Sequence, residues 1–430
     1  MVHVVHHSGS HLEVSAKRIL SGVTYVQIFY KNTYYLQNLP LNYIDCHRRC
    51  VIIMFRKVAV GISGGVDSAV AAFLLKGAGF QVEGVFMRNW DNNYEAGYCS
   101  DEKDFEDAMF VCRKLDIPLH RVYFIKEYWN DVFSILLNEY QSGLTPNPDI
   151  LCNRYIKFDS FFEHCRRNLA VDAIATGHYA NTSFGPFLEK YSENEGVRLL
   201  QPADKHKDQT FFLSQVKPFS LRRCMFPLAN ILKSKVREIA KVEGLLNVAN
   251  KKDSTGICFI GKKNFQDFIE EYIETKKGLF IDIDSGKEVG KHSGLHKWTV
   301  GQRCCLANCK QAYFVFKKDL ESNNIYVVAG TSHTALWNKL CFTDNAHWIY
   351  SEPPDLHCNN VLECYFRFQH TKPLVPCKVV KNYEGLTIIL KTNLRAITEG
   401  QYGVLYKNGE CLGSAKIKDI CHNLKFSHNY

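Results

Sequence analysis

A glycine-rich segment near residue 61 combines residue types suited to binding a nucleotide. It reads Gly61, Ile62, Ser63, Gly64, Gly65, Val66, Asp67, Ser68, between an apolar strand-like run and a stretch with helical periodicity. Glycines allow a tight turn and close backbone approach, and the start of a helix binds phosphate. Asp67 fits beside phosphates if it holds Mg²⁺ that bridges them. The segment therefore predicts a phosphate-binding site in which Asp67 is a Mg²⁺ ligand.

This segment is not the lysine-containing phosphate loop of the GxxxxGK[ST] kind, because no lysine follows the glycines. It matches instead the SGGxDS loop of ATP pyrophosphatases, enzymes that cleave ATP between its α and β phosphates. The alternative interpretation is a glycine turn that opens a helix and binds nothing.

Two of the 17 cysteines stand out by their neighbours. Cys152 follows Thr145-Pro146-Asn147-Pro148-Asp149, where two prolines disfavour a regular helix and indicate a rigid loop. Arg154 and Lys157 follow Cys152, and nearby positive charge favours a thiolate. Asp149 is close enough in sequence to carry a proton. Cys258 lies between glycines in a segment expected to be a mobile loop. Spacing alone does not show that the two cysteines meet, and the alternative for each is a buried, inert thiol.

The elements that would position these residues alternate between strand and helix over the first half of the chain. The expected strands are Val58–Ile62, Val82–Met87, Leu119–Phe124 and Val171–Thr176, and the expected helices begin at Val66, at Ser100 and near Tyr128. This alternation predicts a doubly wound α/β domain with a parallel sheet, in which ligands bind at the carboxyl ends of the strands.

The pattern changes after about residue 222. Helices are expected over Lys233–Val242 and Asn264–Ile273, and short strands dominate beyond Lys287. The predicted organisation is an ATP pyrophosphatase domain over 56–222, a small helical central domain over 223–286 and a C-terminal β-barrel over 287–430. The extension 1–55 is either a transit-like segment or a non-native start before Met54.

Composition limits the class of protein. Hydrophobic residues make up 46% and charged residues 23% of 430 residues, which is typical of a globular protein with two or three domains. No apolar run reaches the roughly 18 residues of a membrane span. The net charge of +9 suits a polyanionic partner without proving one. An odd number of scattered cysteines indicates a reducing compartment.

Six motifs occur in the order found in the tRNA-specific 2-thiouridylases, and the chain resembles this family, above all its animal mitochondrial members. The motifs are SGGVDS at 63–68, FMRNW at 86–90, NPDxxCN at 147–153, TGHY at 176–179, KDQTFFL at 207–213 and GICFIG at 256–261. The likeness extends from about Lys57 to the last strands. It implies that ATP adenylates the C2 oxygen of the wobble uridine, and that a cysteine persulfide then replaces this oxygen with sulfur.

The resemblance also implies roles for individual residues. Cys258 would carry the persulfide sulfur from a donor protein, Cys152 would be the nucleophile that releases this sulfur through a disulfide with Cys258, and Asp149 would be the acid/base. The loop 61–68, Met87 and Gly177 would bind ATP. The expected tRNA contacts are Asn147, Pro148, Asp149, His178, Lys207, Asp208, Gln209, Arg367, Phe368 and Gln401. The expected location is mitochondrial, with the cytoplasm as the alternative; no membrane partner is expected, and the oligomeric state is left open.

One departure from the family lies after Gly301-Gln302-Arg303, where Cys304, Cys305 and Cys309 stand in place of a glycine-rich segment. A metal site there lacks a second spaced pair, so loop drift is the favoured interpretation. Two rival functions remain. Another ATP pyrophosphatase, such as an amide-forming synthetase, would share the loop but not need the two cysteines. A non-catalytic tRNA-binding protein would turn over no ATP.

Overall fold

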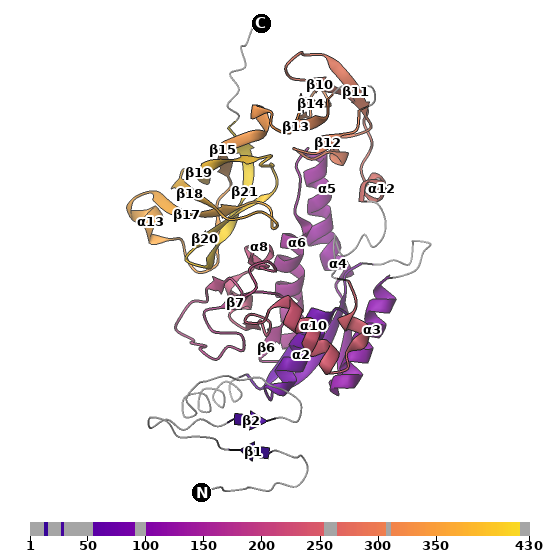
Figure 1. Cartoon of the computed structure of the whole chain (residues 1–430), viewed down its shortest axis with the longest axis vertical. Coiled ribbons are helices and arrows are strands. Elements are labelled where there is room, and N and C mark those ends of the chain that lie inside the picture. The colour runs from indigo at the N-terminus through magenta and orange to yellow at the C-terminus, as the bar shows by residue number, and fades with distance from the viewer. Residues whose placement is uncertain are drawn as a thin grey trace.

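The computed structural model describes three successive units of structure (Figure 1). The residues that it describes are 13–15, 27–29, 55–90, 100–252, 265–306 and 311–421. Of the N-terminal extension it describes only two short antiparallel strands, β1 (Glu13–Ser15) and β2 (Gln27–Phe29). Cys258 and Cys309 lie outside the described residues, so the role of Cys258 stays a prediction.

The first unit is built on a five-stranded parallel sheet in the order β5-β4-β3-β6-β9. Its strands are β3 (Lys57–Gly61), β4 (Gln81–Arg88), β5 (Leu119–Tyr123), β6 (Ala173–Ala175) and β9 (Cys224–Met225). The central strand β3 buries Val58, Ala59 and Val60 completely, as expected where helices cover both faces of a parallel sheet. The predicted α/β fold is confirmed.

The strand order reverses next to β3. From β3 the chain moves outward through β4 and β5, then returns to place β6 on the other side of β3. Ligands of doubly wound folds bind at such a switch point, beyond the carboxyl ends of the strands. The segments that follow β3 and β6 are the predicted ATP loop and the turn that contains Gly177, so the topology brings them together.

Helices of two kinds surround this sheet. Two flank the neighbouring strands, α2 (Val66–Gly77) and α3 (Ser100–Leu115), and two long helical stretches contain π-helical turns. The first stretch comprises α4 (Ile125–Tyr128), η2 (Trp129–Phe133) and α5 (Ser134–Gln141). The second comprises α6 (Pro148–Leu151), η3 (Cys152–Ser160) and α7 (Phe161–Asn168).

The helices that follow the sheet belong to the first unit. The helices α10 (Lys233–Val242) and α11 (Leu246–Ala249) pack against α2. The apolar face of α10 supplies Val236 and Ile239 to the core of the α/β unit. The units of structure therefore do not coincide with the predicted boundaries 223–286 and 287–430, because an amphipathic helix packs where its apolar face is covered.

A second, smaller sheet follows the short helix α12 (Phe265–Glu270). Its order is β11-β10-β14-β13-β12. The strands are β10 (Gly278–Asp282), β11 (Glu288–His292), β12 (Arg303–Cys304), β13 (Tyr313–Asp319) and β14 (Asn324–Ala329). The side chains of Phe280, Val315 and Val327 form its separate core.

The third unit is a closed antiparallel barrel, as predicted. Its strands run in the order β15-β19-β18-β17-β20-β21, and a further pairing of β15 with β21 closes the ring. They are β15 (Trp337–Thr343), β17 (Val361–Arg367), β18 (Val375–Lys381), β19 (Leu386–Arg395), β20 (Tyr402–Lys407) and β21 (Glu410–Ile420). Alternate residues point inward and are buried.

The barrel sheet extends into the α/β unit. Strands β7 (Asn181–Thr182) and β8 (Leu199–Leu200) belong to the first unit, and β8 pairs with β21 of the barrel.

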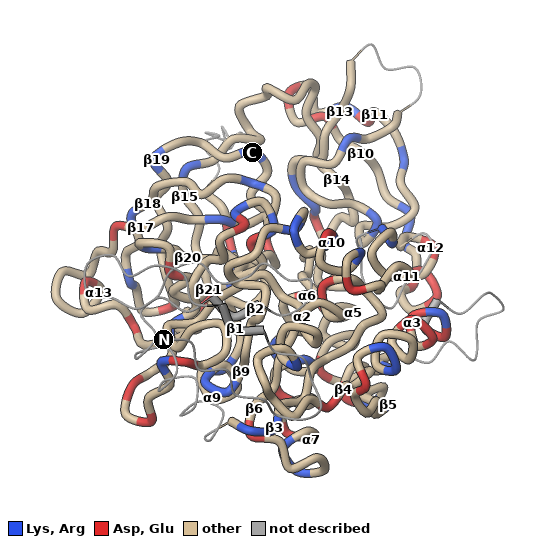
Figure 2. Tube along the Cα trace, turned by 60° about the horizontal axis from the view of Figure 1, so that its bottom comes forward, with Lys and Arg blue, Asp and Glu red and all other residues tan. Residues whose placement is uncertain are grey.

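Figure 2 shows basic and acidic residues interspersed along the trace, including α3. No helix among the described residues combines the length and apolar character that a membrane crossing requires.

Candidate functional site

The glycine-rich loop after β3 is held in one conformation by Ser68. The Ser68 hydroxyl lies 3.1 Å from the backbone N of Ser63, which donates to it, and donates in turn to Gly65 O at 3.0 Å. Gly64 has φ +71, a conformation that favours glycine, and a Cβ there would lie 2.3 Å from Asp104 O. The loop leads directly into α2, whose first-turn N–H groups suit an anionic ligand.

Gly177 and Met87, which are expected to bind ATP, border the same loop. A Cβ on Gly177 would lie 2.7 Å from the backbone N of Ser68, so the turn after β6 touches the start of α2. A Cβ on Gly61 would lie 3.3 Å from Met87 Cε. The structure thus brings together the residues predicted to bind ATP.

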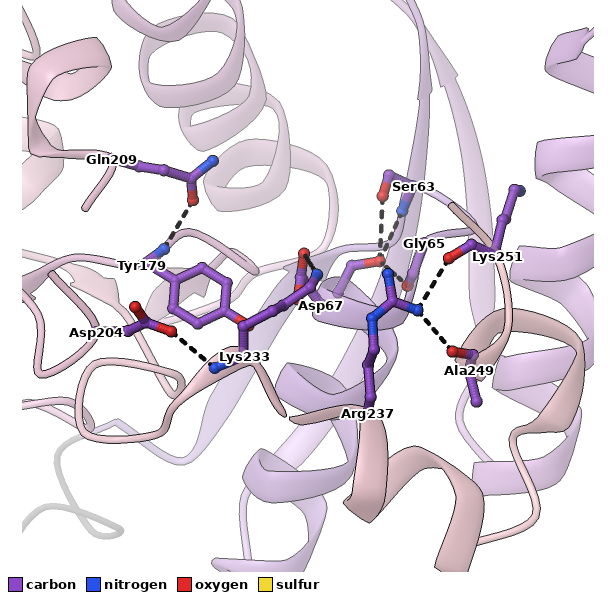
Figure 3. A network of polar contacts seen from close by, with 11 residues as sticks. Ser63, Gly65, Asp67, Tyr179, Asp204, Gln209, Lys233, Arg237, Ala249 and Lys251 are labelled. Atoms are coloured by element: carbon purple, nitrogen blue, oxygen red, sulfur yellow. Dashed lines mark hydrogen bonds and ion pairs between the residues drawn. The ribbon is translucent and has the colours of Figure 1, made fainter. Parts of the chain in front are cut away.

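The carboxylate of Asp67 is engaged by two residues that were not predicted as site residues. Lys233 Nζ donates to both carboxylate oxygens at 2.7 Å, and the Tyr179 hydroxyl donates to Oδ1 at 2.9 Å (Figure 3). A carboxylate beside a phosphate site requires a cation to offset its charge. Lys233 provides this charge in the structure.

Lys233 reaches Asp67 because its helix starts beside the loop. The backbone N–H of Lys233 donates to Asp204 Oδ2 at 2.9 Å, which satisfies an N–H group of the first turn of α10. A lysine in the first turn opposes the helix dipole. The ion pair with Asp67 offsets this unfavourable placement.

A second lysine, Lys251, contacts the loop from the segment after α11. Its Nζ donates to Gly64 O at 3.1 Å and to Asp107 Oδ2 at 2.9 Å, and also to Asp104. Burial alone would lower the pKa of Lys251, but the hydrogen bonds to the two carboxylates outweigh burial and raise its pKa. Lys251 therefore stays charged and fixes the loop against α3.

Cys152 lies on a helical stretch and not on the predicted rigid loop. Pro148 occupies the first turn of α6, where its missing N–H costs nothing, and the side chain of Asn147 caps this helix by accepting from Ile150 N at 3.3 Å. Cys152 then begins the π-helical segment η3 and is 1% exposed. Pro148 starts a helix here, which is why the prediction of a loop at Cys152 was wrong.

The helical stretch that carries Cys152 continues to the ATP loop. The ring of Phe161, the first residue of α7, lies 3.9 Å from the Cβ position of Gly61, and the ring of Phe158 is 5.7 Å from that of His178. The π-helical segment η3 spans the nine residues from Cys152 to Ser160 and ends directly before Phe161. One helical segment thus joins the phosphate loop to the predicted nucleophile.

Two titratable groups near Cys152 have shifted pKa values. Burial raises the pKa of Asp149, while Lys157 and His370 oppose this shift. Burial, followed by the charge of Lys157, lowers the pKa of His178 well below its usual range, and His178 Nδ1 lies 2.9 Å from Thr176 Oγ1. Asp149 therefore retains a proton more readily than an exposed aspartate does, and His178 is neutral.

Several residues predicted to contact tRNA are engaged within the protein. Asp208 is 2% exposed and accepts from Thr210 N at 3.0 Å, and its Oδ2 lies 3.4 Å from Arg367 of the barrel. Phe368 is also 2% exposed. The side-chain carbonyl of Gln209 accepts from Tyr179 N at 2.8 Å, which holds the turn after β6. In this conformation, Asp208 and Phe368 offer almost no side-chain surface to RNA.

Lys207 is half-buried, whereas Asn147 and Gln401 contact each other. Of the cysteines after Arg303, Cys304 is buried in β12 and Cys305 is exposed. Over the described part of the chain, no group of three His, Cys, Asp or Glu residues could hold a metal ion.

Three protein-family models match the three structural units in turn. A family model described as the tRNA methyl transferase HUP domain matches residues 56–262. A second, described as the PRC-barrel domain, matches 266–329, and a third, the aminomethyltransferase beta-barrel domain, matches 338–417. The first match includes α10 and α11, in agreement with their packing.

Three relatives cover most of the chain. A mitochondrial tRNA-specific 2-thiouridylase 1 of Drosophila melanogaster is 53% identical over 85% of this chain and 94% of its own length. That of Homo sapiens is 47% identical over 84% and 90%. The tRNA-specific 2-thiouridylase MnmA of Mycoplasma capricolum is 42% identical over 85% and 100%.

The fold and the phosphate loop define a HUP-domain protein with two appended β units. The chain belongs to the tRNA-specific 2-thiouridylase family. The family predicted from the ordered motifs is thereby confirmed.

Proposed function

We propose that this chain is an ATP-dependent tRNA 2-thiouridylase of the mitochondrion. The observation that carries the proposal is the single helical stretch from Pro148 to Asn168, which joins the phosphate loop to Cys152 and Asp149. A nucleotide bound by the loop and a base held near Cys152 would then both lie along one element. The family name supports tRNA as substrate, and the names of the two animal relatives support the mitochondrial location.

The proposed reaction has two steps. The C2 oxygen of the wobble uridine attacks the α phosphorus of ATP, and pyrophosphate leaves. The terminal sulfur of a persulfide on Cys258 then bonds to C2, and AMP leaves with the former uridine oxygen. Cys152 attacks the inner sulfur, so that a Cys152–Cys258 disulfide forms as sulfur departs. An external thiol reduces this disulfide, and a persulfide donor protein reloads Cys258.

The residues of this chain have distinct tasks in the proposal. The loop 61–68 with Met87 and Gly177 orients ATP, and Asp67 supplies a carboxylate oxygen for Mg²⁺, which would offset phosphate charge. Lys233 donates to the phosphates when it releases Asp67. Asp149, whose pKa is raised by burial, holds a proton near the thiol of Cys152 and takes part in proton transfer. Asn147 and Pro148 contact the target base.

The test is a sulfur-transfer assay with unmodified tRNA, ATP and a persulfide donor, read by mass spectrometry of nucleosides. Cys152→Ala and Cys258→Ala should abolish 2-thiouridine. Cys165→Ala is the matched control, because Cys165 is an equally buried cysteine on α7 of the same helical stretch that has no role in the proposed reaction, and its pKa is raised to about 12. An amide-forming synthetase would form no 2-thiouridine with any of these proteins, the parent included. A non-catalytic binding protein would release no AMP.

A further inference from the structure

A turn of the C-terminal barrel makes hydrogen bonds to the segment that leads to Cys152. The side chain of Gln401 reaches into the α/β unit, where Nε2 donates to Thr145 O at 2.8 Å and Pro146 O at 3.0 Å. Its Oε1 accepts from Asn147 Nδ2 at 3.1 Å. Both N–H donors of the amide are therefore used within the protein.

The neighbouring backbone makes the contact tight. Gly400 has φ +89, and a Cβ there would lie 2.9 Å from both N and O of Thr145. Thr145 N donates to Glu399 O at 3.0 Å. A larger residue than glycine at position 400 would push the two chains apart, so this site requires glycine for close approach.

A short chain of contacts links the hydrogen bonds at Thr145–Asn147 to Cys152. Asn147, held by Gln401, caps α6, and Cys152 is the C-cap residue of that four-residue helix. The cap fixes the first turn of the continuous helical stretch from Pro148 to Asn168, and Cys152 lies directly after that turn. The position of the Cys152 thiol is thus set, through one hydrogen-bonded side chain, by Gln401.

The barrel also contacts the other side of Cys152. Arg154 donates to Gln215 Oε1, and Gln215 Nε2 donates to both O and Oγ of Ser414 on β21 at 2.9 Å. The turn that carries Gln401 is fixed to the same strand, because Gly400 N donates to Ile417 O at 2.9 Å and Ile417 N donates to Gln401 O at 2.8 Å. Strand β21 thus supports the nucleophile segment from both sides.

From this arrangement we propose that Gln401 is a positioning residue for Cys152, and that the barrel orients the nucleophile as well as contacting RNA. The proposal rests on the proposed function and assigns to Gln401 a role different from the direct tRNA contact expected from the family. Misplacement of a reacting group by about 1 Å can cost about a hundredfold in rate. Loss of the Gln401 hydrogen bonds should therefore slow sulfur transfer more than it weakens tRNA binding.

The experiment compares Gln401→Met, which preserves length and volume but has no amide, with Gln401→Glu, which keeps an acceptor but places a carboxylate against two carbonyl oxygens. The matched control is Gln369→Ala, an exposed barrel glutamine. For each full-length protein, the dissociation constant of tRNA and the single-turnover rate at saturating tRNA are measured, with hydrogen exchange of residues 144–157.

In both Gln401 variants we expect the single-turnover rate to fall at least about tenfold, the value for roughly 1.4 kcal/mol of lost orientation. The tRNA dissociation constant should change less than about twofold, and exchange at 144–157 should accelerate; the control should match the parent. Weaker tRNA binding with an unchanged saturated rate would overturn the proposal and make Gln401 an RNA ligand. A parent protein that forms no 2-thiouridine would instead refute the proposed function.

If one variant fails to fold, the other still tests the proposal, because Gln401→Met and Gln401→Glu differ in charge and not in size. Unchanged exchange at 144–157 together with an unchanged rate in a folded variant would also overturn the proposal. Because the single-turnover rate is measured at saturating tRNA, a loss of tRNA affinity alone cannot lower it.

Discussion

The ammonium of Lys233 lies 2.7 Å from both carboxylate oxygens of Asp67, although 166 positions separate the two residues. The side chains are 12% and 33% exposed, so water screens the pair only partly. An aspartate at the start of a phosphate-binding helix would repel phosphate if nothing offset its charge. Lys233 therefore adjusts the electrostatics of the loop for an anionic ligand.

Lys233→Met should weaken the use of ATP. Loss of a hydrogen bond to a charged group costs about 1.5–3 kcal/mol, so kcat/KM for ATP should fall roughly 10- to 100-fold. Pyrophosphate release measured against ATP concentration gives this value. The control is Lys235→Met, on the same helix, where the lysine pairs with Glu238 at the surface. An ATP dependence equal to that of the parent would show that Lys233 does not act at the loop.

Gly177→Ala should disrupt the ATP loop. Its Cβ would lie 2.7 Å from Ser68 N and 2.8 Å from Asp67 C, and both of these atoms belong to backbone that cannot move alone. We expect about 1–3 kcal/mol of destabilisation and weaker ATP binding by calorimetry. Gly77→Ala is the matched control, because nothing lies within 4 Å of its Cβ position at the end of α2. Equal behaviour of the two variants would contradict the close approach.

Sequence reasoning located the ATP loop because its determinants are local. Glycines, a buried strand before them and a helix after them occur within about twenty residues, and β3 and α2 lie where the periodicity predicted them. The pair Asp67–Lys233 escaped prediction because it depends on how α10 packs on α2. Such long-range contacts leave no periodic signal in a single sequence.

The segment around Cys152 shows a second limit. Two prolines favoured a loop, yet Pro148 stands where a helix tolerates proline and Asn147 caps it. Likewise Gln401 and Arg367 were expected at the RNA surface on resemblance alone. Their bonds to Asn147 and Asp208 became visible only in the folded chain. The roles of Cys152 and Cys258, and how the two cysteines approach each other, stay predictions, because Cys258 lies outside the described residues.

Arg367→Ala should destabilise the junction between the barrel and the α/β unit. It would leave the carboxylate of Asp208, whose side chain is 1% exposed, without its cation. Removal of one partner of a buried pair costs about 3–5 kcal/mol, and Arg367→Ala with Asp208→Asn should recover part of this loss. Thermal unfolding of the two single variants and the double variant measures the coupling. If Arg367 served RNA alone, the melting temperature would not change and only tRNA affinity would fall.

The raised pKa of Asp149 predicts how stability depends on pH. Because burial makes the folded state hold this proton more tightly than the unfolded state does, stability falls as pH rises from the ordinary aspartate pKa through the raised value, and then stays lower. Asp149→Asn has no charge to bury, so its stability relative to the parent should increase through that window and level off above it. Its sulfur-transfer activity should be lost, since an amide cannot exchange the proton. Chemical unfolding of both proteins between about pH 3.5 and 8 measures the difference.

Glu163→Gln provides a control of opposite sign, because a hydrogen bond from Arg166 lowers the pKa of Glu163. That variant should lose stability relative to the parent above the ordinary glutamate pKa. The loss should be small, because the ion pair is exposed. A difference for Asp149→Asn that is flat across the range, or of the same sign as the control, would mean that burial does not raise the pKa of Asp149.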